Sequence, residues 1–144
     1  MVKARTSLSI QKAIDSFRNG QMLIVVDDED RENEGDFIIA AEKAAPEDIN
    51  FMMKEGRGLI CVAITSENTE RLQLAPMVST NTAKHQTNFT VSVDAVHKTS
   101  TGISAKDRWE TIQVILNENS IASDLASPGH MFPLTAKSGG VLQR

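Results

Sequence analysis

The sequence predicts an α/β protein of the α+β type, in which helices flank a layered, mixed β-sheet. Segments with apolar side chains at helical spacing alternate along the chain with short apolar runs rich in β-branched residues. The chain has 144 residues, of which 40% are hydrophobic and 24% charged, so one folded core is expected. Its single cysteine excludes a disulfide scaffold, and the longest apolar run, residues 22–26, is too short to cross a membrane.

The first predicted element is a helix that begins after Ser7 and ends at Gly20. Residues 22–26 follow at once and predict a buried strand, and residues 37–41 predict a second one. The apolar face of the helix consists of Ile10, Ala13, Ile14 and Phe17.

A second helix is predicted from Pro46, which is followed by two acidic residues, to about Gly56. Residues 59–64 then form an apolar run typical of a strand. A short helix is expected over residues 67–74, and residues 75–88 have no period and predict a long loop.

Residues 89–94 alternate between apolar and polar side chains, which predicts a half-exposed strand. Ser104 and Asp107 resemble a capping box and start a third amphipathic helix. A last short strand is expected at residues 131–134. With no internal repeat or linker, we expect a single domain over residues 1–144. The apolar face of the third predicted helix consists of Trp109, Ile112, Ile115 and Leu116.

The charge of −4 is unevenly distributed, because residues 27–36 hold seven acids and one arginine, a local charge of −6. The rest of the chain carries 14 bases and 12 acids, and its bases are scattered. This distribution argues against a nucleic-acid-binding surface and points to a local site on a loop between two strands. The start of the chain does not resemble a signal peptide, so a soluble cytoplasmic protein without membrane contact is expected.

Glu32, Glu34 and Asp36 alternate along the acidic loop, so in extended backbone their side chains would share one face. Oxygen donors of this kind suit a hard cation such as Mg²⁺. The spacing fits neither an EF-hand nor a zinc site. A solvated acidic loop without a ligand remains the alternative.

Three further features are weaker on their own. His130 is either a general acid or base or a structural histidine. Cys61 lies in an apolar run and predicts a small buried side chain. Residues 99–104 offer hydroxyl and N–H groups before a helix, which suits either a phosphate-binding site or a simple turn with an N-cap. The residues alone thus indicate metal-assisted chemistry on a small polar substrate.

Six blocks, in this order, span nearly the whole chain and resemble one known family. They are residues 27–36 (DDEDRENEGD), 56–61 (GRGLIC), 89–93 (FTVSV), 101–108 (TGISAKDR), 128–134 (PGHMFPL) and 139–142 (GGVL). Together they resemble 3,4-dihydroxy-2-butanone 4-phosphate synthase of riboflavin biosynthesis. The resemblance implies a lyase that uses Mg²⁺ or Mn²⁺ to convert ribulose 5-phosphate, a sugar phosphate, into 3,4-dihydroxy-2-butanone 4-phosphate and formate. It also implies a homodimer.

The resemblance assigns roles within the acidic loop. It implies that Glu32 is a metal ligand and that Arg31 and Asp36 contact the substrate. It implies that Glu34 and Asp27 are catalytic, as acid–base or positioning groups.

Outside the loop, the resemblance implies that His130 is catalytic and that Cys61 lies close to the substrate. Thr101 and Arg144 would hold its phosphate. Family members continue beyond the position of Arg144 with Gly-His-Thr-Glu, whose His is a second metal ligand. We therefore expect the chain to correspond to the first two-thirds of the family's domain. The alternatives are a catalytically incomplete fragment or a non-catalytic protein that binds a cation or a partner.

Overall fold

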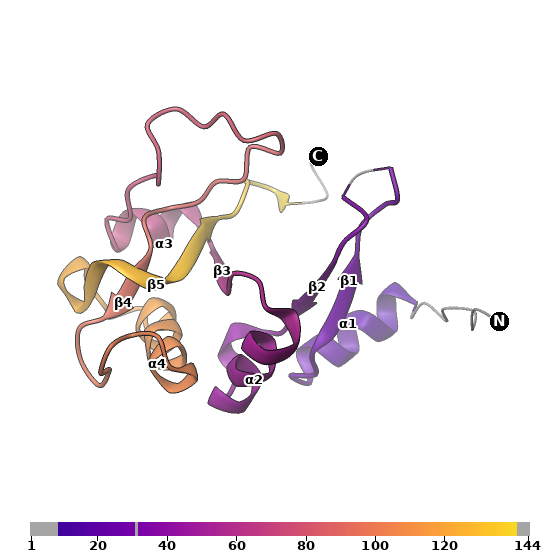
Figure 1. Ribbon diagram of the computed structural model, residues 1–144, viewed down its shortest axis with the longest axis horizontal. Coiled ribbons are helices and arrows are strands. Elements are labelled where there is room, and N and C mark those ends of the chain that lie inside the picture. The colour runs from indigo at the N-terminus through magenta and orange to yellow at the C-terminus, as the bar shows by residue number, and fades with distance from the viewer. Residues whose placement is uncertain (1–8, 31, 141–144) are drawn as a thin grey trace. The chain divides into compact units, whose positions relative to one another are not determined.

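The structure, a computed structural model, describes residues 9–30 and 32–140 (Figure 1). Helices and strands alternate along the chain, and its strands pair in both parallel and antiparallel fashion, as the sequence predicts. The chain divides into two compact units, which meet between Ala44 and Ala45 in the sequence. They are called unit 1 and unit 2 and are described separately. No helix in the described part of the chain is long and apolar enough to cross a membrane.

Unit 1 begins with helix α1 (Ile10–Arg18), which confirms the first predicted helix. Its N-cap is Ser9, whose hydroxyl accepts a hydrogen bond from the backbone N–H of Lys12 at 3.4 Å. Shortly after the helix, Gly20 adopts a φ of 75°, a conformation that glycine takes without strain. The helix therefore ends where the sequence predicts.

Strands β1 (Leu23–Val26) and β2 (Gly35–Ile38) form an antiparallel hairpin. The prediction that these strands are buried is wrong, because the side chain of Ile24 is 67% exposed and that of Val25 47% exposed. A two-stranded hairpin cannot bury its own side chains, so their burial depends on the elements packed against it. Within unit 1 that element is helix α1. A short 3₁₀ turn, η1 (Ala41–Lys43), follows where the second strand was expected to end.

Unit 2 is built on a three-stranded sheet in the order β3 (Cys61–Ile64), β5 (Leu125–Thr135), β4 (Val93–Ala95). Strand β3 runs parallel to β5, and β4 runs antiparallel to it. The sheet is therefore mixed, and its central strand is the last one in the sequence (Figure 1). The predicted strand at residues 131–134 lies within this long central strand.

Helices cover the sheet of unit 2 in layers. Helix α4 (Ala105–Leu116) packs against β4 and β5, and α2 (Pro46–Phe51) packs against α4. The predicted helix over residues 46–56 is confirmed, although its last turn is a π-helix, η2 (Met52–Gly56). Helix α3 (Ser66–Arg71) is shorter than predicted. The most deeply buried apolar side chains of this core are Ile49, Leu72, Val93, Ile115 and Met131.

Irregular backbone connects these elements. Residues 75–88 form the predicted long loop, and a 3₁₀ turn, η3 (Ala122–Asp124), leads into β5. Residues 89 and 90 make only isolated bridges, so the half-exposed strand predicted at 89–94 is regular only from Val93 to Ala95.

Polar contacts hold helix α4 in its middle and at its C-terminal end. The buried hydroxyl of Thr111 accepts a hydrogen bond from the N–H of Ala95 at 2.9 Å and donates to the carbonyl of Asp107 at 3.0 Å, which ties the helix to β4. At the C-terminal end, Arg71 donates to one carbonyl of the last helical turn and to two carbonyls of the residues that follow it. These carbonyls belong to Ile115, Asn117 and Ser120, at 3.1, 3.1 and 2.5 Å.

Candidate functional site

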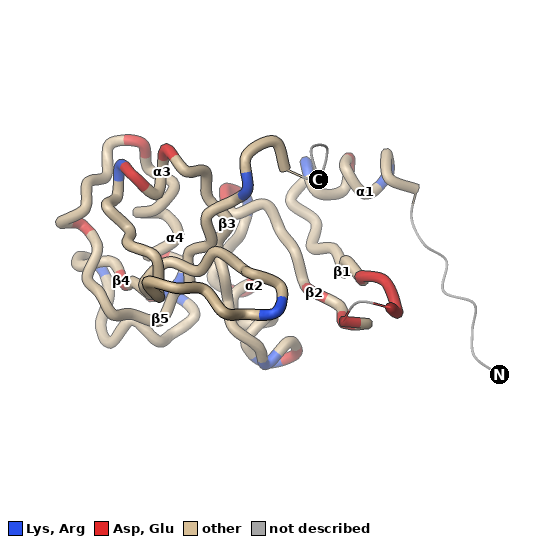
Figure 2. The backbone as a smooth tube through the Cα atoms, turned by 90° about the horizontal axis from the view of Figure 1, so that it is seen from above, with Lys and Arg blue, Asp and Glu red and all other residues tan. Residues whose placement is uncertain are grey.

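The acidic residues gather at the turn between β1 and β2, as the red segment of Figure 2 shows. Asp27 organises this turn, because its Oδ2 accepts the backbone N–H of Glu32 at 3.0 Å and its Oδ1 accepts that of Glu34 at 2.8 Å. The backbone N–H of Asp27 also donates to the carbonyl of Glu34 at 3.3 Å. This carboxylate therefore holds the loop in shape.

The predicted alignment of three acids on one face does not hold in the structure. Asn33 adopts a φ of 52°, so the backbone turns between Glu32 and Glu34 instead of staying extended. Only Asp36 lies within a strand, and the three side chains are exposed. Within residues 9–30 and 32–140, no group of three or more His, Cys, Asp or Glu is arranged to hold a metal ion.

The donor chemistry of the loop nevertheless fits a magnesium ion. Mg²⁺ binds through one or two carboxylates and completes its shell with water and substrate oxygens, so it does not need three protein ligands. The exposed carboxylates of Glu32, Glu34 and Asp36 provide oxygen donors of that kind. Arg31, the predicted substrate contact that precedes Glu32, lies outside the described residues.

His130 lies on a bulge in the central strand of unit 2. In the pairing of β4 with β5, Val93 is opposite Met131, whereas the next residue, Asp94, is opposite Ala126. Residues 127–130 therefore have no partner in the register and leave the plane of the sheet, with a cis peptide bond at Ser127-Pro128. The bulge turns the histidine out of the regular strand.

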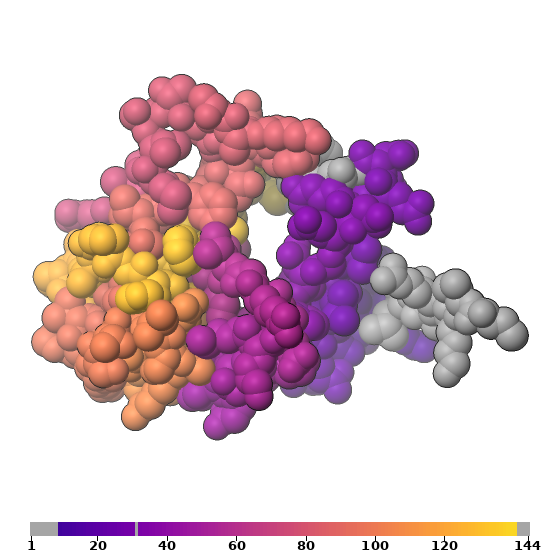
Figure 3. Space-filling model, in the orientation of Figure 1, coloured from indigo at the N-terminus to yellow at the C-terminus, as the bar shows by residue number. Residues whose placement is uncertain are grey.

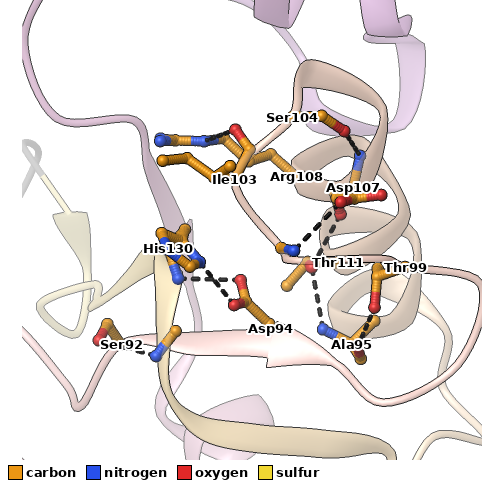
Figure 4. Close-up of polar contacts among 12 residues, drawn as sticks. Ser92, Asp94, Ala95, Thr99, Ile103, Ser104, Asp107, Arg108, Thr111 and His130 are labelled. Atoms are coloured by element: carbon orange, nitrogen blue, oxygen red, sulfur yellow. Dashed lines mark hydrogen bonds and ion pairs between the residues drawn. The ribbon is translucent and has the colours of Figure 1, made fainter.

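Asp94 holds His130 through two contacts (Figure 4). Its Oδ2 lies 2.7 Å from Nδ1 of the imidazole, and its Oδ1 accepts the backbone N–H of His130 at 2.8 Å. The side chain of Asp94 is 15% exposed and that of His130 39% exposed. The imidazole is thus fixed on its Nδ1 side, and no described residue hydrogen-bonds to Nε2.

Two glycines make this contact sterically feasible. Gly129 packs so closely on strand β4 that a Cβ would overlap the backbone between Val93 and Asp94. Gly102 has a φ of 83°, and a Cβ there would overlap the carboxylate of Asp94. Larger residues at either position would displace the carboxylate or the bulge.

The segment at residues 99–104 is a turn with an N-cap. The carboxylate of Asp107 accepts hydrogen bonds from the hydroxyl of Ser100 at 2.8 Å and from the N–H of Gly102 at 3.1 Å, while its own N–H donates to Ser104 Oγ at 3.0 Å. The Ser100 hydroxyl is the main reason that the pKa of Asp107 is lowered. The Ser100 hydroxyl and the Gly102 N–H therefore already have a partner in the chain. The side chain of Thr101, the predicted phosphate contact, is exposed.

The prediction that Cys61 is buried is wrong, because this side chain is exposed. Cys61 is the first residue of β3, opposite Phe132, and the buried side of that strand is formed by Val62 and Ile64. An uninterrupted apolar run does not reveal which face of a strand is covered. Arg144, the other predicted phosphate contact, lies outside the described residues.

Sequence reasoning did not single out Asp94. Among the described residues it is the only side-chain partner of His130, although 36 positions separate the two. Its only signal was its place at the end of the alternating run 89–94.

An open hollow of about 580 Å³ lies beneath the loop of residues 75–88, which stands out from unit 2 in salmon in Figure 3. Its wall combines side chains of the loop with Thr69 and Thr135. No predicted site residue that the structure describes lines this hollow.

A family model described as 3,4-dihydroxy-2-butanone 4-phosphate synthase matches residues 11–144. The riboflavin biosynthesis protein RibBA of Bacillus mycoides is 59% identical to the chain over 135 residues, which are 94% of this chain and 34% of that protein. RibBA of Chlorobium phaeovibrioides is 53% identical over 137 residues, with 33% of that protein covered. The chain therefore spans about a third of the length of these curated relatives.

Solved structures agree in fold. A 3,4-dihydroxy-2-butanone 4-phosphate synthase in complex with two magnesium ions superimposes with a TM-score of 0.91 at 44% identity, covering 96% of this chain and 64% of that one. The two-domain synthase RibBX of A. baumannii gives a TM-score of 0.88 at 42% identity, covering 95% of this chain and 40% of that one. With a family match over nearly its whole length, the chain belongs to the 3,4-dihydroxy-2-butanone 4-phosphate synthase family.

Proposed function

We propose that the protein is a lyase of riboflavin biosynthesis that converts D-ribulose 5-phosphate into 3,4-dihydroxy-2-butanone 4-phosphate and formate. The observation that carries this proposal is the family match over residues 11–144, together with relatives that are named for riboflavin biosynthesis.

The reaction is an internal rearrangement followed by a cleavage. The two products together have the same elemental composition as ribulose 5-phosphate, so the reaction consumes no oxidant, reductant or water overall. It needs groups that remove and return protons next to a carbonyl, and groups that stabilise the enediolate formed when a proton leaves.

In the acidic loop, we assign Glu32 to hold Mg²⁺, with Mn²⁺ as the alternative ion. A bound divalent ion would stabilise negative charge on the oxygens of the substrate. The exposure of the loop carboxylates supports this assignment, as does a relative solved with two magnesium ions. Glu34 is assigned to acid–base chemistry, and Arg31 and Asp36 to contacting the substrate.

Asp27 is assigned a positioning role in the loop. Both of its carboxylate oxygens already accept backbone N–H groups, those of Glu32 and Glu34. These two hydrogen bonds fix the backbone of the two glutamates.

In unit 2, we assign His130 to proton transfer at Nε2. The contact with Asp94 supports this role, since it leaves Nε2 of a partly exposed ring available to a substrate. Cys61, which is exposed at the start of β3, is assigned to line the substrate, and Thr101 and Arg144 to hold its phosphate. The geometry around His130 favours the lyase over a non-catalytic cation-binding protein, because binding a cation does not require an oriented histidine.

We also propose that the protein works as a homodimer in the cytoplasm, and that residues 1–144 belong to a single synthase domain. The family resemblance supports these assignments. Size-exclusion chromatography with light scattering would test the dimer.

The test of the proposed function is formate release from ribulose 5-phosphate with Mg²⁺. It should be measured on this chain and on a version extended to the full length of the solved synthases. We expect formate and the phosphorylated butanone in equal amounts from the extended version, and no turnover when the cation is removed with a chelator. An absence of formate from both versions would overturn the proposal.

A further inference from the structure

We propose that Asp94 is a positioning residue that fixes the imidazole of His130 with its proton on Nδ1, so that Nε2 is the atom that exchanges protons with the substrate. The part of this inference that concerns the substrate rests on the proposed function. The part that concerns the histidine ring stands on the geometry alone.

The first argument is that one carboxylate binds His130 at two points. Oδ1 accepts the backbone N–H at 2.8 Å, and Oδ2 lies 2.7 Å from Nδ1. The backbone contact sets the position of the residue, and the side-chain contact sets the rotation of its ring. A short contact with an ionised oxygen is stronger than one with a neutral acceptor.

The second argument is that the carboxylate is itself held in place. The residue after Asp94 is Ala95, whose N–H donates to the buried hydroxyl of Thr111 on α4. The carboxylate of Asp94 also lies against Gly102, where any side chain would occupy the space that the carboxylate takes up. A group supported in this way keeps its geometry before a substrate binds, which is the condition for efficient proton transfer.

The third argument concerns the position of the proton. An ionised carboxylate only accepts hydrogen bonds, so Nδ1 must be the donor in the contact with Asp94. In a neutral ring the lone pair then lies on Nε2, which can take up a proton and later return it. An asparagine at position 94 could donate through its amide and would allow the opposite arrangement.

The experiment that tests this inference is ¹⁵N NMR of the histidine rings in this chain, recorded where the imidazoles are neutral. We expect His130 to carry its proton on Nδ1. His97 is exposed and has no hydrogen-bond partner in the described part of the chain, so it should show the ordinary Nε2–H form and serves as an internal reference. A wild-type His130 with its proton on Nε2 would overturn the proposal without any variant.

Asp94→Asn should shift His130 toward the Nε2–H form. The matched control is Asp124→Asn, because Asp124 also accepts a backbone N–H, that of Ile121 at 2.9 Å, and should leave His130 unchanged. An unchanged ring in Asp94→Asn, with folding verified by circular dichroism, would contradict the inference.

Kinetics on the extended version then separate this inference from the proposed function. We expect Asp94→Asn to lower kcat by about 100-fold or more with little change in KM, because the substrate still binds while the base is in the wrong protonation form. An unchanged kcat would refute the positioning role. If the wild-type extended version released no formate, the proposed function would fail, whereas the NMR result would still decide how Asp94 holds the ring.

Discussion

The acidic hairpin of unit 1 and the His130 bulge of unit 2 place polar side chains next to strands in contrasting ways. In the hairpin, the carboxylates of Glu32 and Glu34 are exposed, and the turn is held by local hydrogen bonds to Asp27. In the bulge, His130 is held by Asp94 and is followed by the fully buried Met131. One site is organised by its own loop and the other by the core of its unit.

This structural difference suits the two sites to different chemical roles. A proton-transfer group works best when its orientation is fixed before the substrate arrives, because no reorganisation is then needed during the reaction. Crowded, exposed carboxylates repel one another, and a bound cation relieves that repulsion. We therefore expect the histidine to be pre-oriented, and the exposed carboxylate side chains of the hairpin to be ordered by their ligand.

The largest expected effect concerns the fixed site. His130→Gln in the extended version should lower turnover by about 10³-fold, because general acid–base catalysis contributes about 10²–10⁴. The measurement is the initial rate of formate release. His97→Gln is the matched control and should retain the wild-type rate, and a loss of less than about tenfold in His130→Gln would contradict the assigned role.

The corresponding change in the hairpin is Glu32→Gln. We expect turnover to fall by about 10²–10³-fold and Mg²⁺ to bind more weakly, because a neutral amide replaces a charged oxygen ligand. Rates of formate release and calorimetric titration with Mg²⁺ would measure the two effects. Glu29→Gln removes an exposed acid from the same loop and serves as the control, and unchanged turnover in Glu32→Gln would refute its assignment as a ligand.

Stability should also differ between the units. Ile115 is 1% exposed in unit 2, and its replacement by alanine should lower the free energy of unfolding by about 3 kcal/mol. Ile24 is 67% exposed in unit 1, and the same replacement should lower it by less than about 1 kcal/mol. Urea unfolding followed by circular dichroism would compare them, and equal losses would show that the hairpin is packed as tightly as the core.

A smaller effect is expected in the pH dependence of unit 2. Hydrogen bonds, above all from the Ser100 hydroxyl, lower the pKa of Asp107 from its ordinary 3.8. A group whose folded-state pKa is lowered stabilises the protein above its unfolded-state pKa, and this contribution is lost as the pH falls through the folded-state value. The wild-type advantage over Asp107→Asn in urea unfolding should therefore be constant above about pH 5 and shrink below about pH 4.

Ser100→Ala offers a sharper form of the same test. It removes the largest cause of the shift, so the pKa of Asp107, measured by NMR, should move back toward 3.8. An unchanged pKa of Asp107 would mean that the hydrogen bond from the Gly102 N–H is sufficient to keep this pKa low.

Local patterns account for most of the secondary structure. Helix α4 has both a capping serine, Ser104, and apolar residues at helical spacing, so its start follows from neighbouring residues. Its predicted apolar face is confirmed only in part, because Ile112 and Ile115 are buried whereas Leu116 is 37% exposed. The π turn at the end of the second helix does not follow, since nothing in the sequence of residues 52–56 distinguishes it from an α-helical turn.

Burial and site geometry depend on distant partners. Ile24 and Cys61 lie in apolar runs and are nevertheless exposed, because a run does not specify what covers it. The loop of acids was predicted, but its turn at Asn33 was not. The partnership of Asp94 with His130 depends on a bulge and on the pairing of two strands far apart in the sequence, so no local pattern predicts it.

The most direct test of the central claim is a product analysis of the extended version. Ribulose 5-phosphate is incubated with the protein and Mg²⁺, and both carbon-containing products are followed by NMR. The account predicts that formate and 3,4-dihydroxy-2-butanone 4-phosphate appear together in a one-to-one ratio as the substrate disappears. A substrate that remains unchanged, or formate that appears without the four-carbon phosphate, would contradict it.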